Sequence, residues 1–118
     1  MNVAIYARVA ATLQNETDEN LNAQIQEIET WAKENGHVIV NQYLDLGTSA
    51  LDYDRPGFQQ LIKDAQLQSH PFDAIVVTVI SRLFRELAVY AFYQRRLDHF
   101  KVTIISIADM AKLRESLT

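Results

Sequence analysis

The sequence predicts an α/β domain of three layers, in which helices cover both faces of a mostly parallel sheet of four to five strands. Two observations lead to this fold class. Short apolar runs alternate along the chain with segments whose apolar residues recur every three or four positions. The chain has 118 residues, of which 48% are apolar, so residues 1–118 are expected to form one domain with a buried core.

The first half of the chain is expected to form two strands with a helix between them. Residues 3–7 are a short apolar run, typical of a strand that is buried on both faces. Residues 20–35 place apolar residues on one helical stripe, and Gly36 follows as a left-handed C-terminal cap. Residues 38–43 predict the second strand. Residues 45–54 are rich in Gly, Thr, Ser and Asp and predict a loop.

The second half repeats this alternation. Asp54 is the expected N-cap of the next helix, with a proline tolerated in its first turn. Residues 72–80 are apolar and β-branched and predict the third strand. Ser81 is expected to cap a long helix that reaches about His99. Residues 102–107 predict the fourth strand, and the remaining residues show a helical pattern.

The composition argues against several kinds of site. The chain has no cysteine, which excludes disulfides and thiolate metal sites and fits a reducing compartment, so we expect a cytoplasmic protein. Its three histidines are scattered, and we expect no metal and no cofactor. There is no signal peptide pattern and no apolar run long enough for a membrane span.

The charge distribution is more informative than its total. A net charge of −4 argues against a general nucleic-acid binder, which usually has a basic face. The acids, however, are concentrated between Glu16 and Glu34, whereas arginines cluster between Arg82 and Arg96. A local cationic pocket on an acidic domain is therefore compatible with the composition.

Candidate site residues, most of them polar or charged, follow three of the predicted strands. They are Arg8 and Ala10 after the first strand, Asp45 and Ser49 after the second, and Ser81, Arg82 and Arg85 after the third. Ligands of open α/β sheets bind beyond the carboxyl ends of the strands, so these three segments should converge on one site. Arg82 and Arg85 are expected to share one face in the first turn of a helix, where the helix dipole favours an anion.

Arginine is suited to phosphate because its planar fork holds two oxygens at once and stays charged. Arg8, Arg82 and Arg85 together would therefore hold one phosphate group. The alternative interpretation is that each of them pairs with a nearby acid, such as Asp45 or Glu86. A Rossmann-type nucleotide site is disfavoured, because no strand is followed by the glycine pattern of such sites.

Five short motifs, in this order, resemble the catalytic domain of the serine recombinases. They are residues 5–10 (Ile-Tyr-Ala-Arg-Val-Ala), Gln14, residues 45–49 (Asp-Leu-Gly-Thr-Ser), residues 55–58 (Arg-Pro-Gly-Phe) and residues 81–85 (Ser-Arg-Leu-Phe-Arg). This is the resolvase/invertase family, and the spacing resembles most its large serine integrase and transposon branch. The resemblance extends from Val3 to about Ile107, nearly the whole chain.

The resemblance implies a DNA strand exchange without metal or cofactor. In that family a serine hydroxyl attacks a backbone phosphate and forms a phosphoserine link to the DNA 5′ end. By this resemblance Arg8, Arg82 and Arg85 would hold the phosphate with support from Arg55, and Asp45 would orient an arginine. Gln14 and Ser49 would shape the pocket. The resemblance also implies DNA as partner, a homodimer or homotetramer of the full-length protein, and a long dimerisation helix and a C-terminal DNA-binding region outside these residues.

Two positions depart from the family pattern. Ala10 stands where the family has its nucleophilic serine, so the chain as written should not cleave DNA. Ser81 stands where an acidic residue is common. Ala10 has three explanations: an engineered substitution, a naturally inactive relative, or a role taken over by Thr12. The alternative function is accordingly an inactive, DNA-associated regulator that oligomerises on the same scaffold.

The expected helix after the third strand has more apolar residues than one stripe requires. They are Leu83, Phe84, Leu87, Ala88, Ala91 and Phe92. The excess would either be buried against a second subunit or belong to a wide core face. The sequence leaves both alternatives open.

Overall fold

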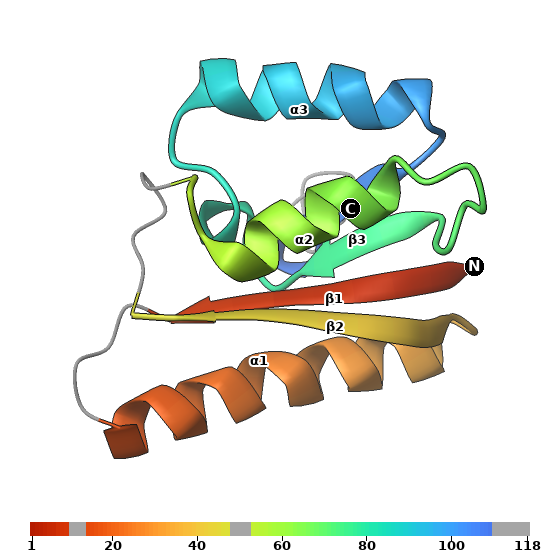
Figure 1. Cartoon of the computed structure of the whole chain (residues 1–118). Helices are drawn as coiled ribbons and strands as arrows, with labels where there is room; N and C mark the ends of the chain where they lie inside the picture. The colour runs from red at the N-terminus through yellow and green to blue at the C-terminus, as the bar shows by residue number, and fades with distance from the viewer. Residues whose placement is uncertain (10–13, 48–52, 110–118) are drawn as a thin grey trace.

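Four parallel strands form the centre of the computed structural model (Figure 1). They are β1 (Asn2–Val9), β2 (Val38–Leu46), β3 (Ala74–Val77) and β4 (Thr103–Ser106), and their order in the sheet is β2-β1-β3-β4. The structure describes residues 1–9, 14–47 and 53–109, and for residues 14–19 it describes the backbone only. The predicted α/β class and the parallel sheet are confirmed.

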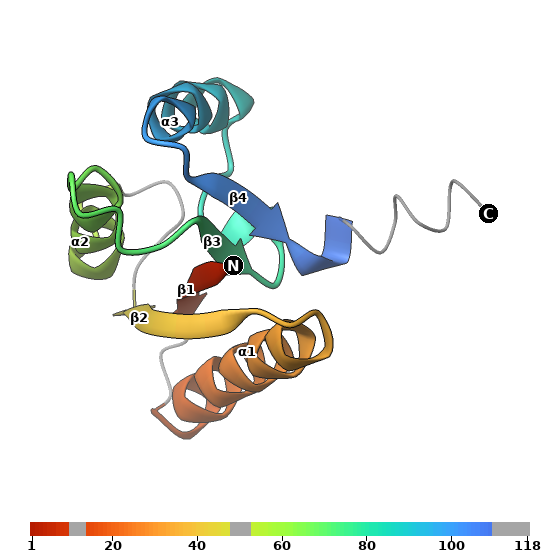
Figure 2. The same ribbon diagram turned by 90° about the vertical axis from the view of Figure 1, so that its right-hand side faces the viewer.

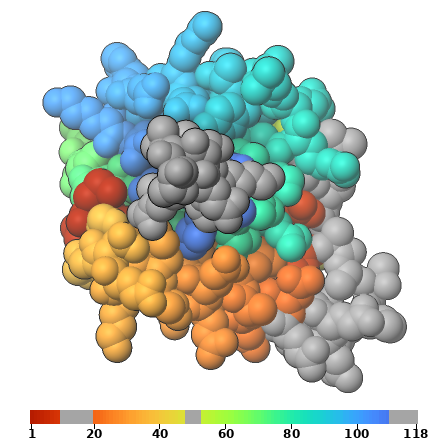
Figure 3. Space-filling model, turned by 180° about the vertical axis from the view of Figure 1, so that it is seen from behind, coloured from red at the N-terminus to blue at the C-terminus, as the bar shows by residue number. Residues whose placement is uncertain are grey.

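Helices cover both faces of the sheet, as predicted (Figure 2). Helix α1 (Gln14–Glu34) lies on one face, and α2 (Pro56–Ala65) and α3 (Leu87–His99) lie on the other. In the space-filling view from behind, α3 and α1 form opposite margins of the molecule (Figure 3). Among the residues that the structure describes, no helix is both long and apolar enough to cross a membrane.

Strand β1 is buried on both faces, because it lies in the interior of the sheet and helices cover the sheet on both sides. Val3 and Ile5 pack with Ile28 on the side of α1. The alternate residues, Ala4 and Tyr6, pack on the other side in a core that includes residues of α2 and α3. This is the pattern that a run of apolar residues without alternation predicts.

Several elements differ from their predicted boundaries. Helix α1 begins at Gln14, before the predicted start, and β3 ends at Val77, before the predicted end. The predicted loop at residues 45–54 is wrong at its beginning, because Asp45 belongs to β2 and lies opposite Arg8 of β1. Gly36 has a φ of +72°, which confirms the predicted left-handed cap.

The predicted N-cap of α2 is wrong. Arg55, not Asp54, occupies that position, and its side chain makes no capping hydrogen bond. Instead Asp45 of β2 accepts hydrogen bonds from the backbone N–H groups of Gly57 (2.8 Å) and Phe58 (2.9 Å). A carboxylate from a neighbouring strand therefore fills the role of a local cap, because it satisfies N–H groups that a helix start leaves unpaired.

The long helix predicted to start at Ser81 is also wrong. Residues 80–82 form a single 3₁₀ turn, and α3 begins only at Leu87. The backbone carbonyls of Ser81 and Arg82 accept hydrogen bonds from the guanidinium of Arg8, and those of Arg82 and Leu83 accept from Arg55. Because arginine side chains take up these carbonyls, the segment is held as a loop and not as the first turn of a helix.

Substitution of Gly57 by alanine tests the contact between α2 and β2. A Cβ at position 57 would lie 2.6 Å from the carbonyl oxygen of Leu44 and 2.9 Å from Oδ2 of Asp45, so backbone would have to move. We expect Gly57→Ala to lower the free energy of unfolding in urea by about 1–3 kcal/mol. The control Lys63→Ala, at an exposed position of the same helix, should change it by less than about 0.5 kcal/mol. Equal stability of both variants would contradict the close contact.

Candidate functional site

Three buried or half-buried arginines meet where β1 and β2 end. Arg8 lies in β1, Arg55 directly precedes α2, and Arg82 ends the 3₁₀ turn after β3. Hydrogen bonds join all three through the backbone of residues 81–83. The sequence prediction that separate loops converge at the carboxyl edge of the sheet is therefore correct for Arg8 and Arg82.

Arg55 is among the largest completely buried side chains of the described residues, with 0% exposure. Its Nη1 donates to the hydroxyl of Tyr6 (2.8 Å) and to the carbonyl of Arg82 (3.0 Å), and its Nη2 donates to the carbonyl of Leu83 (2.7 Å). The guanidinium carbon also lies 4.8 Å from the ring centre of Phe58. Arg55 thus connects β1, the start of α2 and the loop after β3.

Arg8 and Arg82 hold each other in place. Nε of Arg8 donates to the carbonyl of Arg82 (3.0 Å), and its Nη2 donates to that of Ser81 (3.4 Å). In return, Nη1 of Arg82 donates to the carbonyl of Arg8 (3.1 Å). Each guanidinium is hydrogen-bonded to the backbone of the other residue, and these bonds hold both side chains in place.

Asp45 and Tyr6 complete this network. The Tyr6 hydroxyl donates to Oδ2 of Asp45 (2.8 Å) and accepts from Nη1 of Arg55 (2.8 Å). Burial, and then the hydrogen bond to Asp45, raise the pKa of Tyr6 well above its ordinary value. The hydroxyl therefore keeps its proton, and Tyr6 links the guanidinium of Arg55 to the carboxylate of Asp45.

The electrostatics of the site favour an anion. Among the described residues, the network joins three guanidinium groups with the single carboxylate of Asp45. Burial, and then the charge of Arg55, lower the pKa of Arg8, while Tyr6 opposes this shift and Arg82 and Arg85 add to it. The positive charge that gathers here would be relieved by a bound phosphate or sulfate group.

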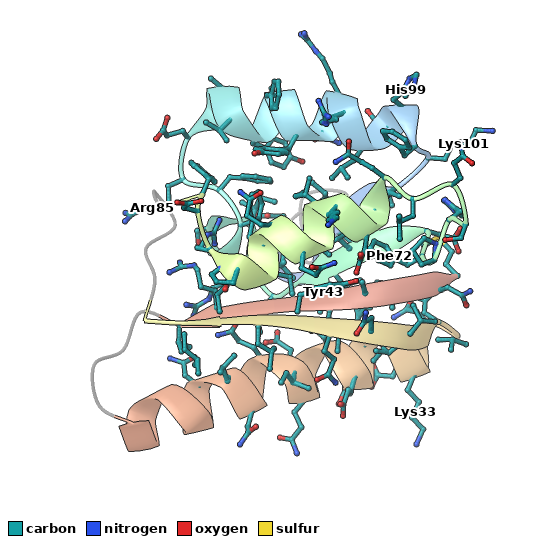
Figure 4. The ribbon with its side chains drawn as sticks, viewed as in Figure 1. Lys33, Tyr43, Phe72, Arg85, His99 and Lys101 are labelled. Atoms are coloured by element: carbon teal, nitrogen blue, oxygen red, sulfur yellow. The ribbon has the colours of Figure 1, made fainter. Side chains whose placement is uncertain are left out.

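The structure brings together only some of the predicted site residues. Ser81 is exposed and contributes its carbonyl, not its hydroxyl, to the network. Arg85 is exposed and its side chain points away from the body of the protein (Figure 4), so it does not share a helix face with Arg82. Ala10 and Ser49 lie outside the described residues, and the side chain of Gln14 is not described either.

Sequence reasoning missed the contribution of Gln24. This residue of α1 is only 4% exposed, and its amide pairs with both backbone groups of Arg8, donating to the carbonyl (3.1 Å) and accepting from the N–H (3.3 Å). The signal was present, because Gln24 interrupts the apolar stripe between Leu21 and Ile28. A polar residue on a buried helix face requires a specific partner.

Comparisons with known proteins show which family and which folds this chain resembles. Residues 3–117 match the family model described as "Resolvase, N terminal domain". No curated protein matches the chain. Among the residues that the structure describes, no group of histidine or acidic side chains is placed to hold a metal ion.

Two solved catalytic domains have a similar fold. The N-terminal catalytic domain of TP901-1 integrase is 29% identical with a TM-score of 0.83, over 92% of this chain and 79% of that domain. The C-terminal catalytic domain of ISC1926 TnpA, an IS607-like serine recombinase, is 26% identical with a TM-score of 0.78, over 91% and 70%. A resolvase family recombinase from Streptococcus pneumoniae, 24% identical with a TM-score of 0.77 over 92% and 73%, has the same fold.

Exchange of Arg55 for lysine tests the role of the buried guanidinium. Lysine keeps the positive charge but cannot reach three acceptors with a planar fork, so at least one carbonyl of the loop after β3 would lose its donor. We expect Arg55→Lys to lower the free energy of unfolding by about 3 kcal/mol. The matched control Arg95→Lys, at an exposed position of α3, should leave it unchanged in the same urea titration. A tolerated Arg55→Lys would mean that charge alone is sufficient at this position.

Proposed function

The chain belongs to the resolvase N-terminal domain family of serine recombinases, and from this premise we propose that it is the catalytic domain of a site-specific DNA recombinase of the integrase or transposon type. One observation supports the proposal: the guanidinium groups of Arg8 and Arg82 are each hydrogen-bonded to the backbone of the other residue, at the end of β1 and close in sequence to residue 10. A DNA phosphodiester would bind to these two groups.

In this proposal Arg8 and Arg82 bind the non-bridging oxygens of the scissile phosphate, because their guanidinium groups are already oriented by backbone hydrogen bonds. Of the three arginines predicted to hold the phosphate, Arg85 is the exposed one, and it would approach the phosphate from the solvent side. Arg55 and Gln24 bind no DNA themselves but position the groups that do. Gln14, Ser49 and Ser81 would line the surrounding pocket, and Asp45 orients Arg55 through Tyr6.

The chemical step requires an oxygen that Ala10 lacks. A serine hydroxyl at position 10 would attack the phosphorus atom, forming a bond to the 5′ phosphate while the bond to the 3′ oxygen breaks. The hydroxyl proton would leave and the departing 3′ oxygen would gain a proton. Because alanine ends in a methyl group, the chain as written would bind the phosphodiester without cleaving it.

We further propose that DNA sequence recognition belongs to a part of the protein outside these 118 residues, and that the working form is a homodimer or homotetramer. The net charge of −4 supports this division, since an acidic domain opposes general DNA binding. Ala10 itself favours the second candidate function, a regulator that occupies DNA and oligomerises but does not cut.

Restoration of the hydroxyl separates these two functions. We expect the complete protein with Ala10→Ser to form a covalent 5′ phosphoserine adduct with supercoiled plasmids that carry DNA from around its own gene, whereas the unchanged protein forms none. The adduct is scored as protein that stays on labelled DNA after denaturation. A matched control is the neighbouring Ala11→Ser, which places the hydroxyl on the next residue and should give no adduct, because the position of the attacking oxygen decides whether the reaction occurs.

The double variant Ala10→Ser/Arg82→Gln should lose about 100-fold or more of the adduct rate, as expected when one preorganised donor to the reacting phosphate is removed. An Ala10→Ser protein that binds DNA without any adduct would contradict the recombinase function and support the regulator. An adduct formed by the unchanged protein, and lost in Thr12→Val, would show that Thr12 supplies the nucleophile.

A further inference from the structure

An aromatic cluster joins helix α3 to the arginine site. Its members come from the segment before α2, from α2, from the loop after β3 and from α3, and they are Tyr53, Phe58, Phe84, Tyr90 and Tyr93. All five belong to the core on the side of the sheet that α2 and α3 cover (Figure 1). The outer helix of this side is therefore connected to the inner one, and to the loop after β3, through aromatic rings.

Tyr93 of α3 contacts three other members of the cluster. Its ring centre lies 5.2 Å from that of Phe58, at an interplanar angle of 84°, and 5.6 Å from that of Phe84, at an angle of 16°. A third contact, to Tyr53, has a distance of 6.5 Å between the ring centres. These separations are those of favourable aromatic pairs. All three contacts are made by the ring of Tyr93.

Two of these partners also contact Arg55. The guanidinium carbon of Arg55 lies 4.8 Å from the ring centre of Phe58 and 5.6 Å from that of Tyr53. Hydrogen bonds hold Nη1 and Nη2 of Arg55, whereas its buried Nε has no partner among the described residues. The rings beside the guanidinium therefore complete its surroundings, and Tyr93 packs directly behind them.

The third partner, Phe84, belongs to the loop that carries Arg82. Phe84 is 4% exposed and follows Arg82 by two residues. This loop is held from two sides. Arg55 donates hydrogen bonds to the carbonyls of Arg82 and Leu83, and the ring of Phe84 stacks on Tyr93. The position of Arg82 thus depends on a contact with α3 as well as on the buried arginine.

We propose that Tyr93 is a positioning residue of the phosphate site, a role that rests on the proposed function. Its ring holds Phe58 and Phe84 in place, and through them Arg55 and Arg82, without touching the phosphate itself. Protein interiors are closely packed, so removal of the Tyr93 ring leaves a space into which its neighbours move. If Tyr93 served core packing alone, its loss would lower stability but leave the arginines of the folded protein where they are.

The first test needs no DNA. Nε of Arg8 donates to the carbonyl of Arg82 (3.0 Å), so the hydrogen exchange rate of this Nε–H group, followed by NMR, reports whether the two arginines are still held together. In Tyr93→Leu this rate should rise at least about tenfold, because the bond opens more often. Tyr93→Phe keeps the ring and should show the rate of the unchanged chain.

The control is Leu97→Ala, in the same helix and the same core cluster. Leu97 is 1% exposed and lies about one helical turn beyond Tyr93, so this variant removes buried apolar atoms without removing a ring of the aromatic cluster. It should lower the midpoint of thermal unfolding but leave the Arg8 exchange rate unchanged when both are measured well below that midpoint. Equal acceleration by both variants, or no acceleration in Tyr93→Leu, would overturn the proposal. If Tyr93→Leu does not fold, Phe84→Leu interrupts the same stack and should give the same result.

The second test uses the complete protein with Ala10→Ser. Adding Tyr93→Leu should lower the rate of adduct formation at saturating DNA by about 10- to 100-fold, since small displacements of positioning groups are costly, and adding Tyr93→Phe should not lower it. The DNA concentration that gives half the maximal rate should stay the same. An unchanged maximal rate in Tyr93→Leu would overturn the positioning role. If Ala10→Ser alone forms no adduct, the recombinase function is contradicted, and the exchange measurement still decides whether Tyr93 holds the arginines.

Discussion

The buried guanidinium of Arg55 is the interaction on which the rest of this structure depends. Burial of an arginine is costly unless its N–H groups find acceptors, and here Nη1 and Nη2 donate to the Tyr6 hydroxyl and the carbonyls of Arg82 and Leu83, while Nε has no partner among the described residues. Satisfying Arg55 therefore fixes the loop after β3 against the end of β1. The same loop carries Arg82, so a requirement of the core sets the geometry of the anion site.

The arginine site is connected to the core by further buried hydrogen bonds. Asp45 accepts hydrogen bonds from the start of α2 and from Tyr6, and Gln24 ties α1 to the backbone of Arg8. Helices α1 and α2 are thus each connected to the end of a strand by one buried polar side chain. Such a network fixes the position of the arginines more closely than apolar packing would, because hydrogen bonds depend on direction as well as distance.

The sequence predicts the layers of the fold well and the loops around the site poorly. The sheet is predicted by the apolar runs of β1 and β3, and a covering helix by the apolar stripe of α1. These patterns are reliable because burial of apolar surface is the main contribution to stability in these elements. The sequence predicts Asp54 and Ser81 as helix caps from their immediate neighbours, and both predictions are wrong for the same reason. The side chains that hydrogen-bond to the backbone at these two places are those of Asp45, Arg8 and Arg55, which are distant in sequence.

The most direct measurement of the central claim is a crystal structure of the chain grown in ammonium sulfate or soaked with dimethyl phosphate. If the arginine cluster is a phosphate site, the anion will lie against the guanidinium groups of Arg8 and Arg82, with Arg85 turned towards it. An empty site in which these side chains turn apart to separate carboxylates would contradict the account.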